Sequence, residues 1–357
     1  MDLTPVSETL FNALSVSSIL ILTALGLSIT FGVMKVINMA HGEMLMLGAY
    51  TAFLVEDKDA ISIAVRNWGR ILSALSRFVG LNPESLGFTK WETTLGLELN
   101  LYWAILIAFI LVSGVGYLLE VCLIRFLYGR PLDTLLATWG VGIIIQQLVN
   151  LTFGPQLPPM HMPDELQGNW QAGGMAIPIF RVFTVGIAGL CLLAVYLWFF
   201  RTSFGLKIRA VVQNRPMAAA LGISTRRVDS LTFAFASGLA GVAGCILAHQ
   251  YNARYNMGGD YIVKAFMVVI LGGMGQMSGT VAGGTTIGTS ESVLAKVLGS
   301  EWLKGVAGWL GISSEDWNRI IGSNADTLAL IFVLLVVIGF IMIRPSGLFA
   351  TKERSYE

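Results

Sequence analysis

Apolar runs of membrane-spanning length recur along the whole chain, separated by short polar connections. Nine segments can be drawn, near residues 11–34, 39–55, 100–125, 133–153, 179–200, 228–249, 261–272, 280–297 and 325–343. The seventh is too short for a full crossing and predicts a half-helix or a re-entrant piece. The alternating pattern of an outer-membrane barrel is absent. The pattern therefore predicts an all-α, polytopic helical integral membrane protein.

The composition supports this fold class. Hydrophobic residues make up 55% of the 357 residues and charged residues 13%, and the mean hydropathy is +0.70. A soluble domain carries about 25% charged residues, so this chain lacks the polar surface that a water-facing body needs. Cys122, Cys191 and Cys245 all fall inside apolar runs and are expected to be small buried side chains. We predict one transmembrane domain over residues 1–357.

Lys and Arg predict how the chain is oriented, because they accumulate in cytoplasmic loops. Three regions are basic, and with nine crossings all three share one side, the predicted cytoplasm. The N-terminus and the acidic loop 154–178 then lie outside. The basic residues are Arg125 and Arg130 after the third segment, Arg201, Lys207, Arg209, Arg215, Arg226 and Arg227 after the fifth, and Arg344, Lys352 and Arg354 in the tail.

Two polar inserts interrupt the pattern, at residues 56–99 and 298–324, and both are predicted to be external. Residues 61–81 of the first read as an amphipathic helix with Arg66, Arg70 and Arg77 on one face. Such a helix either lies flat on the bilayer surface or covers a partner subunit.

Motifs of soluble enzymes are absent from the sequence. There is no G-x-x-x-x-G-K-[ST] phosphate loop, no H-E-x-x-H, no Cys/His cluster and no G-x-S-x-G, and the chain has three histidines. We therefore predict that the protein is not an enzyme and has no metal site or cofactor. Nucleic acid is not expected as a partner, whereas the lipid bilayer is.

Polar side chains within the apolar segments are the candidate functional residues, because such groups are costly at membrane depth. The stretch "VINMAHGEMLMLGAY" (36–50) holds Asn38, His41 and Glu43. In one interpretation Asn38 caps the second helix and Glu43 complements its positive end. In the other, these residues line the inner mouth of a path. We expect Asn38 and His41 to face the path, with Glu43 as helix support.

Further polar and aromatic residues lie in later segments. Gln146, Gln147 and Trp139 are candidates for lining the path, although Trp139 also suits membrane-interface anchoring. Structural pairing is expected for Glu120 with Arg125, and for Lys264 with Asp260.

The basic connection 201–227 is predicted to hold a short helix over 216–221. Pro216 suits its first turn and Gly222 its end. Ser224 or Thr225 then caps the next helix. A short cytoplasmic helix of this kind could dock into a groove on another protein, while the basic residues alone could equally mark an ordinary cytoplasmic loop.

Three stretches together resemble one family, the permease subunits of ABC importers for branched-chain amino acids and urea. They are "LGLSITFGVMKVINMAHGEMLMLGAY" (25–50), "NRPMAAALGISTRRVDSLTFAFASGLAGVAGCILA" (214–248) and "VVILGGMGQMSGTVAGG" (268–284). The motif "INMAHGE" (37–43) is more similar to the urea permeases of this family. The two inserts are longer than the basic family pattern.

The resemblance implies a second, related permease subunit, two cytoplasmic ATPase subunits and an external substrate-binding protein, in the bacterial inner membrane. It also implies that 214–223 is the coupling helix, formed by Arg215, Pro216, Ala218, Ala219, Ala220 and Gly222. Urea is the expected substrate and branched-chain amino acids are the alternative. A channel or secondary transporter that acts alone is the competing class.

Overall fold

The computed structural model describes residues 4–57, 59–78, 100–160, 162–172, 175–300, 302–304, 317–319, 321, 324–344 and 347–349. It separates into two compact units, which are described one at a time. Unit 1 comprises residues 1–32, 165–202 and 263–357, and unit 2 comprises residues 33–164 and 203–262.

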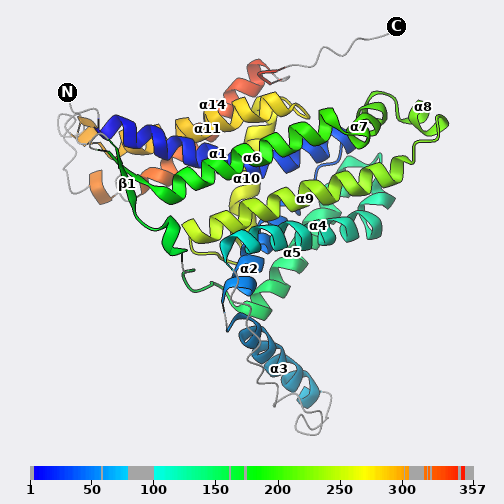
Figure 1. Ribbon diagram of the computed structural model, residues 1–357, viewed down its shortest axis with the longest axis horizontal. Helices are drawn as coiled ribbons and strands as arrows, with labels where there is room; N and C mark the ends of the chain where they lie inside the picture. The colour runs from blue at the N-terminus through cyan, green and yellow to red at the C-terminus, as the bar shows by residue number, and fades with distance from the viewer. Residues whose placement is uncertain are drawn as a thin grey trace. The chain divides into compact units, whose positions relative to one another are not determined.

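Each of the nine predicted apolar segments is helical, which confirms the all-α fold class (Figure 1). The corresponding helices are α1 (Thr4–Met34), α2 (His41–Glu56), α4 (Leu101–Cys122), α5 (Pro131–Phe153), α6 (Ile179–Arg201), α9 (Thr225–Gln250), α10 (Met257–Gly272), α11 (Met277–Leu298) and α14 (Ala325–Ile343). Shorter elements connect them: α3 (Ala60–Phe78), η3 (Ile124–Leu127), η4 (Asp164–Leu166), α7 (Ser203–Gln213) and α8 (Arg215–Ala220). The sequence did not predict α7, or the antiparallel strand pair β1 (Asn169–Ala172) and β2 (Met175–Pro178).

Fewer helices can cross a membrane than the nine segments suggested. Within the described residues, six helices are long and apolar enough, or seven if the pair α10 and α11, bent by 120°, is counted as one span. At 16 residues, α2 is too short, since a span needs about 20. The prediction of a half-helix at the seventh segment agrees with α10, but the count of nine full crossings is too high.

Two classes of spanning helix differ in how they are buried. In α1 and α9 more than four-fifths of the apolar window is buried, whereas α4, α5, α6 and α14 bury about a fifth. Each of these four buries a narrow stripe of residues spaced about one turn apart, and most of these residues are small in α4, α5 and α14, whereas the stripe of α6 also includes Phe180 and Phe199. Examples are Ala104, Ala108, Val112 and Gly116 in α4, and Ala329, Val333 and Val337 in α14. Small residues let helix backbones approach closely where no water drives association.

In unit 2, α2 and α4 both pack on α9. A Cβ added at Gly244 of α9 would lie 1.8 Å from the carbonyl oxygen of Leu45 in α2, and one at Gly48 would lie 2.0 Å from that of Gly241. A Cβ at Gly116 of α4 would lie 2.3 Å from the Ser237 hydroxyl of α9. These close approaches make α2, α4 and α9 a tightly packed three-helix body.

The two ends of unit 2 carry different elements. At one end, α3 docks on the last turn of α5: the Asn67 amide donates to the Thr152 carbonyl at 2.8 Å and the Trp68 indole to its hydroxyl at 3.0 Å. The loop between α4 and α5, together with α8, lies at the other end of α5, about 35 Å away for 23 residues. The 60–78 part of the first insert therefore lies at the opposite end of α5 from α8. Residues 79–99 lie outside the described residues, as does most of the 298–324 insert.

Unit 1 is held together by close helix contacts and by a partly buried ion pair. A Cβ at Gly284 or Gly288 of α11 would lie within 2.5 Å of Ile21 or Ser17 of α1, and α11 also packs on α14. Lys264 of α10 donates to Glu291 of α11 at 2.5 Å, so the ion pair joins the two helices of the bent pair. The predicted pairing of Lys264 with Asp260 is wrong, and the Asp260 carboxylate pairs with Arg254 instead.

Candidate functional site

The break between α1 and α2 places three polar residues inside unit 2. Lys35 adopts a left-handed conformation (φ 53°), and the chain then runs without regular structure to the start of α2 at His41. Asn38 and His41 are fully buried, and Glu43 is 8% exposed. A sequence that avoids charge thus buries an amide, an imidazole and a carboxyl group within six residues.

The three polar residues lie beside the neighbouring helix α5. The Met39 amide donates to the Thr138 hydroxyl at 3.1 Å, and the Glu43 side chain lies beside Gly142. Thr138 and Gly142 are about 11 and 17 Å along the roughly 35 Å length of α5. The chain from Met39 to Glu43 therefore lies beside the part of α5 that is a third to a half of the way along its length.

Glu43 is enclosed by helix starts. It lies in the first turn of α2, and a Cβ at Gly258, in the first turn of α10, would lie 2.9 Å from its carboxyl carbon. The exposed N–H groups of a helix start carry partial positive charge, which favours an acidic side chain. This surrounding supports the expected role of Glu43 as helix support.

Asn38 does not cap α2, contrary to one predicted interpretation. Ala40 occupies the N-cap position and makes no side-chain hydrogen bond to the helix. Both polar atoms of the Asn38 amide are buried without a hydrogen-bond partner. An unsatisfied buried amide destabilises a fold by about 1–3 kcal/mol, so a purely structural purpose does not explain it.

The other predicted path residues, Trp139, Gln146 and Gln147, lie on different faces of α5. Gln146 of α5 is half-buried next to the stripe formed by Thr138, Gly142 and Val149. Gln147 is exposed and Trp139 is 55% exposed, so both point outward from unit 2. The structure brings Asn38, His41 and Glu43 together and leaves Trp139 and Gln147 apart from them.

The predicted short helix is present as α8. Asn214 caps it by accepting a hydrogen bond from the Met217 amide at 3.0 Å, and Gly222 ends it with φ 83°. Within this fully described helix Ala218 is the buried residue, while Pro216, Ala219 and Ala220 are exposed. The exposed apolar side chains Met217 and Leu221 flank them. Ser224 stands at the N-cap position of α9, without a side-chain hydrogen bond.

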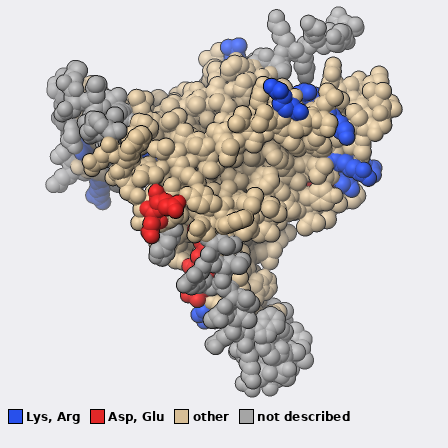
Figure 2. Space-filling view, viewed as in Figure 1, with Lys and Arg blue, Asp and Glu red and all other residues tan. Residues whose placement is uncertain are grey.

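Charged groups are scarce over most of the surface in Figure 2, and Lys and Arg gather where Figure 1 labels α7 and α8. The loop between α4 and α5 lies at the same end, because its Arg125 donates to Ser230 of α9 at 3.1 Å. Two of the three predicted cytoplasmic regions therefore share one end of unit 2.

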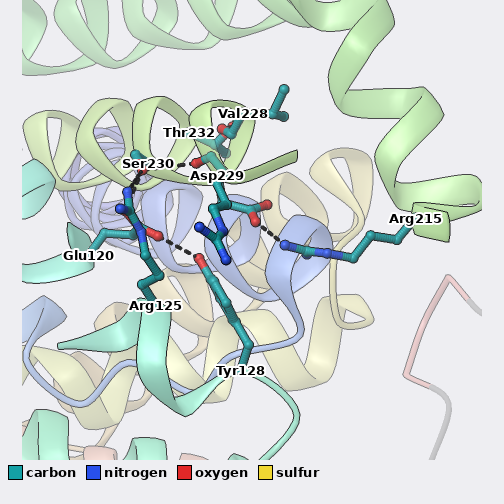
Figure 3. A network of polar contacts seen from close by, with 9 residues as sticks. Glu120, Arg125, Tyr128, Arg215, Val228, Asp229, Ser230 and Thr232 are labelled. Carbon is teal, nitrogen blue, oxygen red and sulfur yellow. Dashed lines mark hydrogen bonds and ion pairs between the residues drawn. The ribbon is translucent and has the colours of Figure 1, made fainter. Parts of the chain in front are cut away.

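A polar network connects α8 to α9, to α4 and to the loop between α4 and α5 (Figure 3). Arg215 forms an ion pair with the fully buried Asp229 and lies 5.1 Å from the centre of the Tyr128 ring. The Tyr128 hydroxyl donates to the buried Glu120 at 2.9 Å, and Ser230 donates to the other oxygen of that carboxylate. Burial raises the pKa of Tyr128, so its hydroxyl stays protonated as a donor. The predicted pairing of Glu120 with Arg125 is confirmed at 3.4 Å.

Sequence reasoning missed the members of this network that lie between the recognised motifs. Tyr128 and Ser230 are unremarkable residue types in a loop and a helix start. Asp229 offered a usable signal, since it is the single acid in a strongly basic connection. A lone acid among many bases predicts an ion pair, but the sequence does not indicate which base it joins.

These features define a multi-pass helical membrane protein with buried polar groups at membrane depth and an exposed short helix at one end. Residues 9–343 match the family described as "Branched-chain amino acid transport system / permease component", and the chain belongs to this family. It is therefore a permease component of an ABC importer and not an enzyme.

Individual relatives share about a quarter of their residues with this chain. The permease protein BraD of the Pseudomonas aeruginosa high-affinity branched-chain amino acid transport system is 28% identical, covering 84% of this chain and 90% of that protein. LivH of Salmonella typhimurium is 28% identical over 83% of this chain and 88% of its own length. A probable branched-chain amino acid permease of Methanocaldococcus jannaschii is 25% identical and covers 81% of each chain. These names support the family, whereas the expected closeness to the urea permeases stays a prediction.

Replacing Asn38 with leucine is expected to stabilise the protein while reducing transport. Leucine has a similar shape and removes two unsatisfied polar atoms, so the free energy of unfolding should rise by about 1–3 kcal/mol. The melting temperature in detergent and solute uptake in cells measure the two effects. A lower melting temperature, or unchanged uptake, would contradict a transport role for the buried amide.

Proposed function

We propose that the chain forms one half of the translocation path of an ABC importer, with a second, related permease as the other half. Two cytoplasmic ATPase subunits bind at the α8 end, and an external binding protein delivers the solute at the opposite end. Family membership supports this assembly, since a permease component acts with ATPase and binding-protein partners. The assembly would lie in the bacterial inner membrane.

The observation that carries the proposal is the form of α8. It exposes a small apolar surface formed by Pro216, Met217, Ala219 and Leu221, while Arg215 and Ala218 connect it to unit 2. Exposing an apolar surface to water is unfavourable. The surface is therefore suited to insertion into a groove of a partner protein. We assign α8 as the coupling helix that receives the movement of the ATPase subunits.

Branched-chain amino acids are the substrates that the relatives favour, because BraD and LivH are permease proteins of branched-chain amino acid transport systems. Urea is the second candidate. The Asn38–Met39 motif favours urea. The chemistry of the buried residues also favours it, because an amide, an imidazole and a carboxyl group could bind a small planar amide. Under either candidate, Asn38 and His41 face the path and Glu43 supports the helix start. Gln146 is a further candidate lining residue.

Uptake of labelled leucine and labelled urea separates the two substrates. Cells that carry the complete transporter are compared with cells that lack this chain alone. Loss of leucine uptake with urea uptake intact supports an amino-acid importer, and the reverse result supports a urea importer. If neither uptake changes, both candidates are wrong.

A channel or secondary transporter acting alone is the competing class. Reconstitution of this chain by itself in vesicles tests it directly. We expect no solute flux until the partner permease, the ATPase subunits and ATP are all supplied. Flux through the isolated chain would contradict the proposed function.

A further inference from the structure

We infer that the network around Arg215 and Asp229 makes α8 move as one body with α2, α4 and α9, so that it carries displacement of α8 to the break that holds Asn38. This inference rests on the proposed function and assigns Arg215, Tyr128, Glu120 and Asp229 as positioning residues. None of the four touches the solute.

The first step is the attachment of α8 to α9. Within the fully described helix α8, Ala218 is the residue buried by packing, so packing alone holds it weakly. Arg215 adds an ion pair with Asp229, whose side chain is completely buried. Removing the guanidinium would leave a buried carboxylate without its counterion, which is strongly unfavourable, so the pair resists separation when α8 is pushed.

The second step joins α4 to the same attachment. The Tyr128 ring lies under the Arg215 guanidinium, and its hydroxyl reaches Glu120 near the end of α4 (Figure 3). Ser230, next to Asp229 in α9, donates to the same carboxylate. Asp229 of α9 and Glu120 of α4 are thus linked through Arg215 and Tyr128, so a shift of α8 acts on both helix ends.

The third step runs along the helices. About 20 Å of uninterrupted helix separates Asp229 from the Gly241–Gly244 region of α9. There the backbones of α9 and α2 touch through Gly48 and Gly244, and α4 packs on α9 through Gly116 and Ser237. Helices in such close contact shift together because packed interiors resist deformation. The N-terminal turn of α2 then moves His41, and with it the break at residues 35–40.

The ratio of solute imported to ATP hydrolysed tests the network in the complete transporter. Arg215→Gln and Asp229→Asn are each expected to lower this ratio about tenfold, because single changes along a coupling network weaken the coupling between two sites. ATP hydrolysis itself should change little, because neither residue belongs to the ATPase subunits. Arg215→Lys keeps the positive charge but loses the planar group over the Tyr128 ring, so its ratio should lie between those of Arg215→Gln and the wild type. Arg201→Gln, an exposed arginine of the same connection, is the matched control and should match the wild type.

A milder variant protects the test against failed assembly. Tyr128→Phe keeps the ring beneath Arg215 and removes only the hydroxyl that donates a hydrogen bond to Glu120. Because the change is small, the complex should assemble. A coupling ratio below wild type in Tyr128→Phe supports the network. A wild-type ratio in both Tyr128→Phe and Arg215→Gln would overturn it. Absence of ATP-driven uptake by the wild-type complex would instead overturn the proposed function.

Spin labels report the shared movement directly. Labels on Met217→Cys in α8 and on the exposed native Cys122 in α4 are used, with Cys191 and Cys245 replaced by alanine. The distance between them should be the same with and without bound nucleotide in the wild-type complex, and should change with nucleotide in Arg215→Gln. A nucleotide-dependent distance in the wild type would show that α8 moves separately and overturn the inference.

Discussion

Replacing Gly244 with alanine is expected to prevent the protein from reaching a stable folded state. The added methyl carbon would lie 1.8 Å from the Leu45 carbonyl oxygen, and a backbone atom cannot rotate away as a flexible side chain would. The helices α2 and α9 must separate along their contact, at a cost above about 3 kcal/mol. The yield of monodisperse protein in detergent and the melting temperature measure the loss.

Gly140 supplies the matched control. It also lies in a spanning helix, α5, but a Cβ added there has nothing within 4 Å. Gly140→Ala should therefore leave the melting temperature unchanged or raise it, since alanine favours a helix over glycine by about 1 kcal/mol. Equal melting temperatures for the two alanine variants would show that the α2–α9 contact is looser than described.

Replacing Ala219 with aspartate is expected to abolish ATP-driven uptake without disturbing the inserted protein. Ala219 is exposed on α8, so the fold can accept the new side chain. In the proposed contact with the ATPase, the carboxylate would be buried without a partner. This should lower the affinity for the ATPase at least about tenfold, which corresponds to about 1.4 kcal/mol. Uptake should fall at least about tenfold at an unchanged melting temperature.

Two other substitutions in the same connection serve as controls for the Ala219→Asp experiment. Ala218→Asp places the charge at the buried position of α8, so it should lower the melting temperature as well as uptake. Ser203→Asp adds the same charge to an exposed residue of the same connection but outside α8, and uptake should persist. Normal uptake with Ala219→Asp would mean that the ATPase docks elsewhere.

The helices were predictable because apolar length and helix boundary residues are local properties of the sequence. The start and end of α8 followed from Pro216 and Gly222, and the stretches around residues 25–50 and 214–248 indicated the family. The count of crossings was less predictable, because an apolar segment such as α2 reads the same whether it spans the bilayer or begins within it.

The environment of the polar residues required the three-dimensional contacts. Asn38 and Glu43 are five residues apart in the sequence, yet their burial depends on α5 and on the first turn of α10. The partner of Lys264 is likewise 27 residues away, on the other arm of a bend whose angle the sequence does not specify. Pairings between helices depend on how those helices cross, and a single sequence carries no direct record of crossing.

The narrow buried stripes of α4, α5 and α14 bear on how such a chain diverges over evolution. Each of these helices depends on a few small residues, such as Ala104, Ala108 and Gly116, while most of its surface needs only to remain apolar. Leucine, isoleucine, valine and phenylalanine can replace one another on such a surface with little effect on the fold. A permease built in this way can keep its architecture while sharing only 25–28% of its residues with a relative.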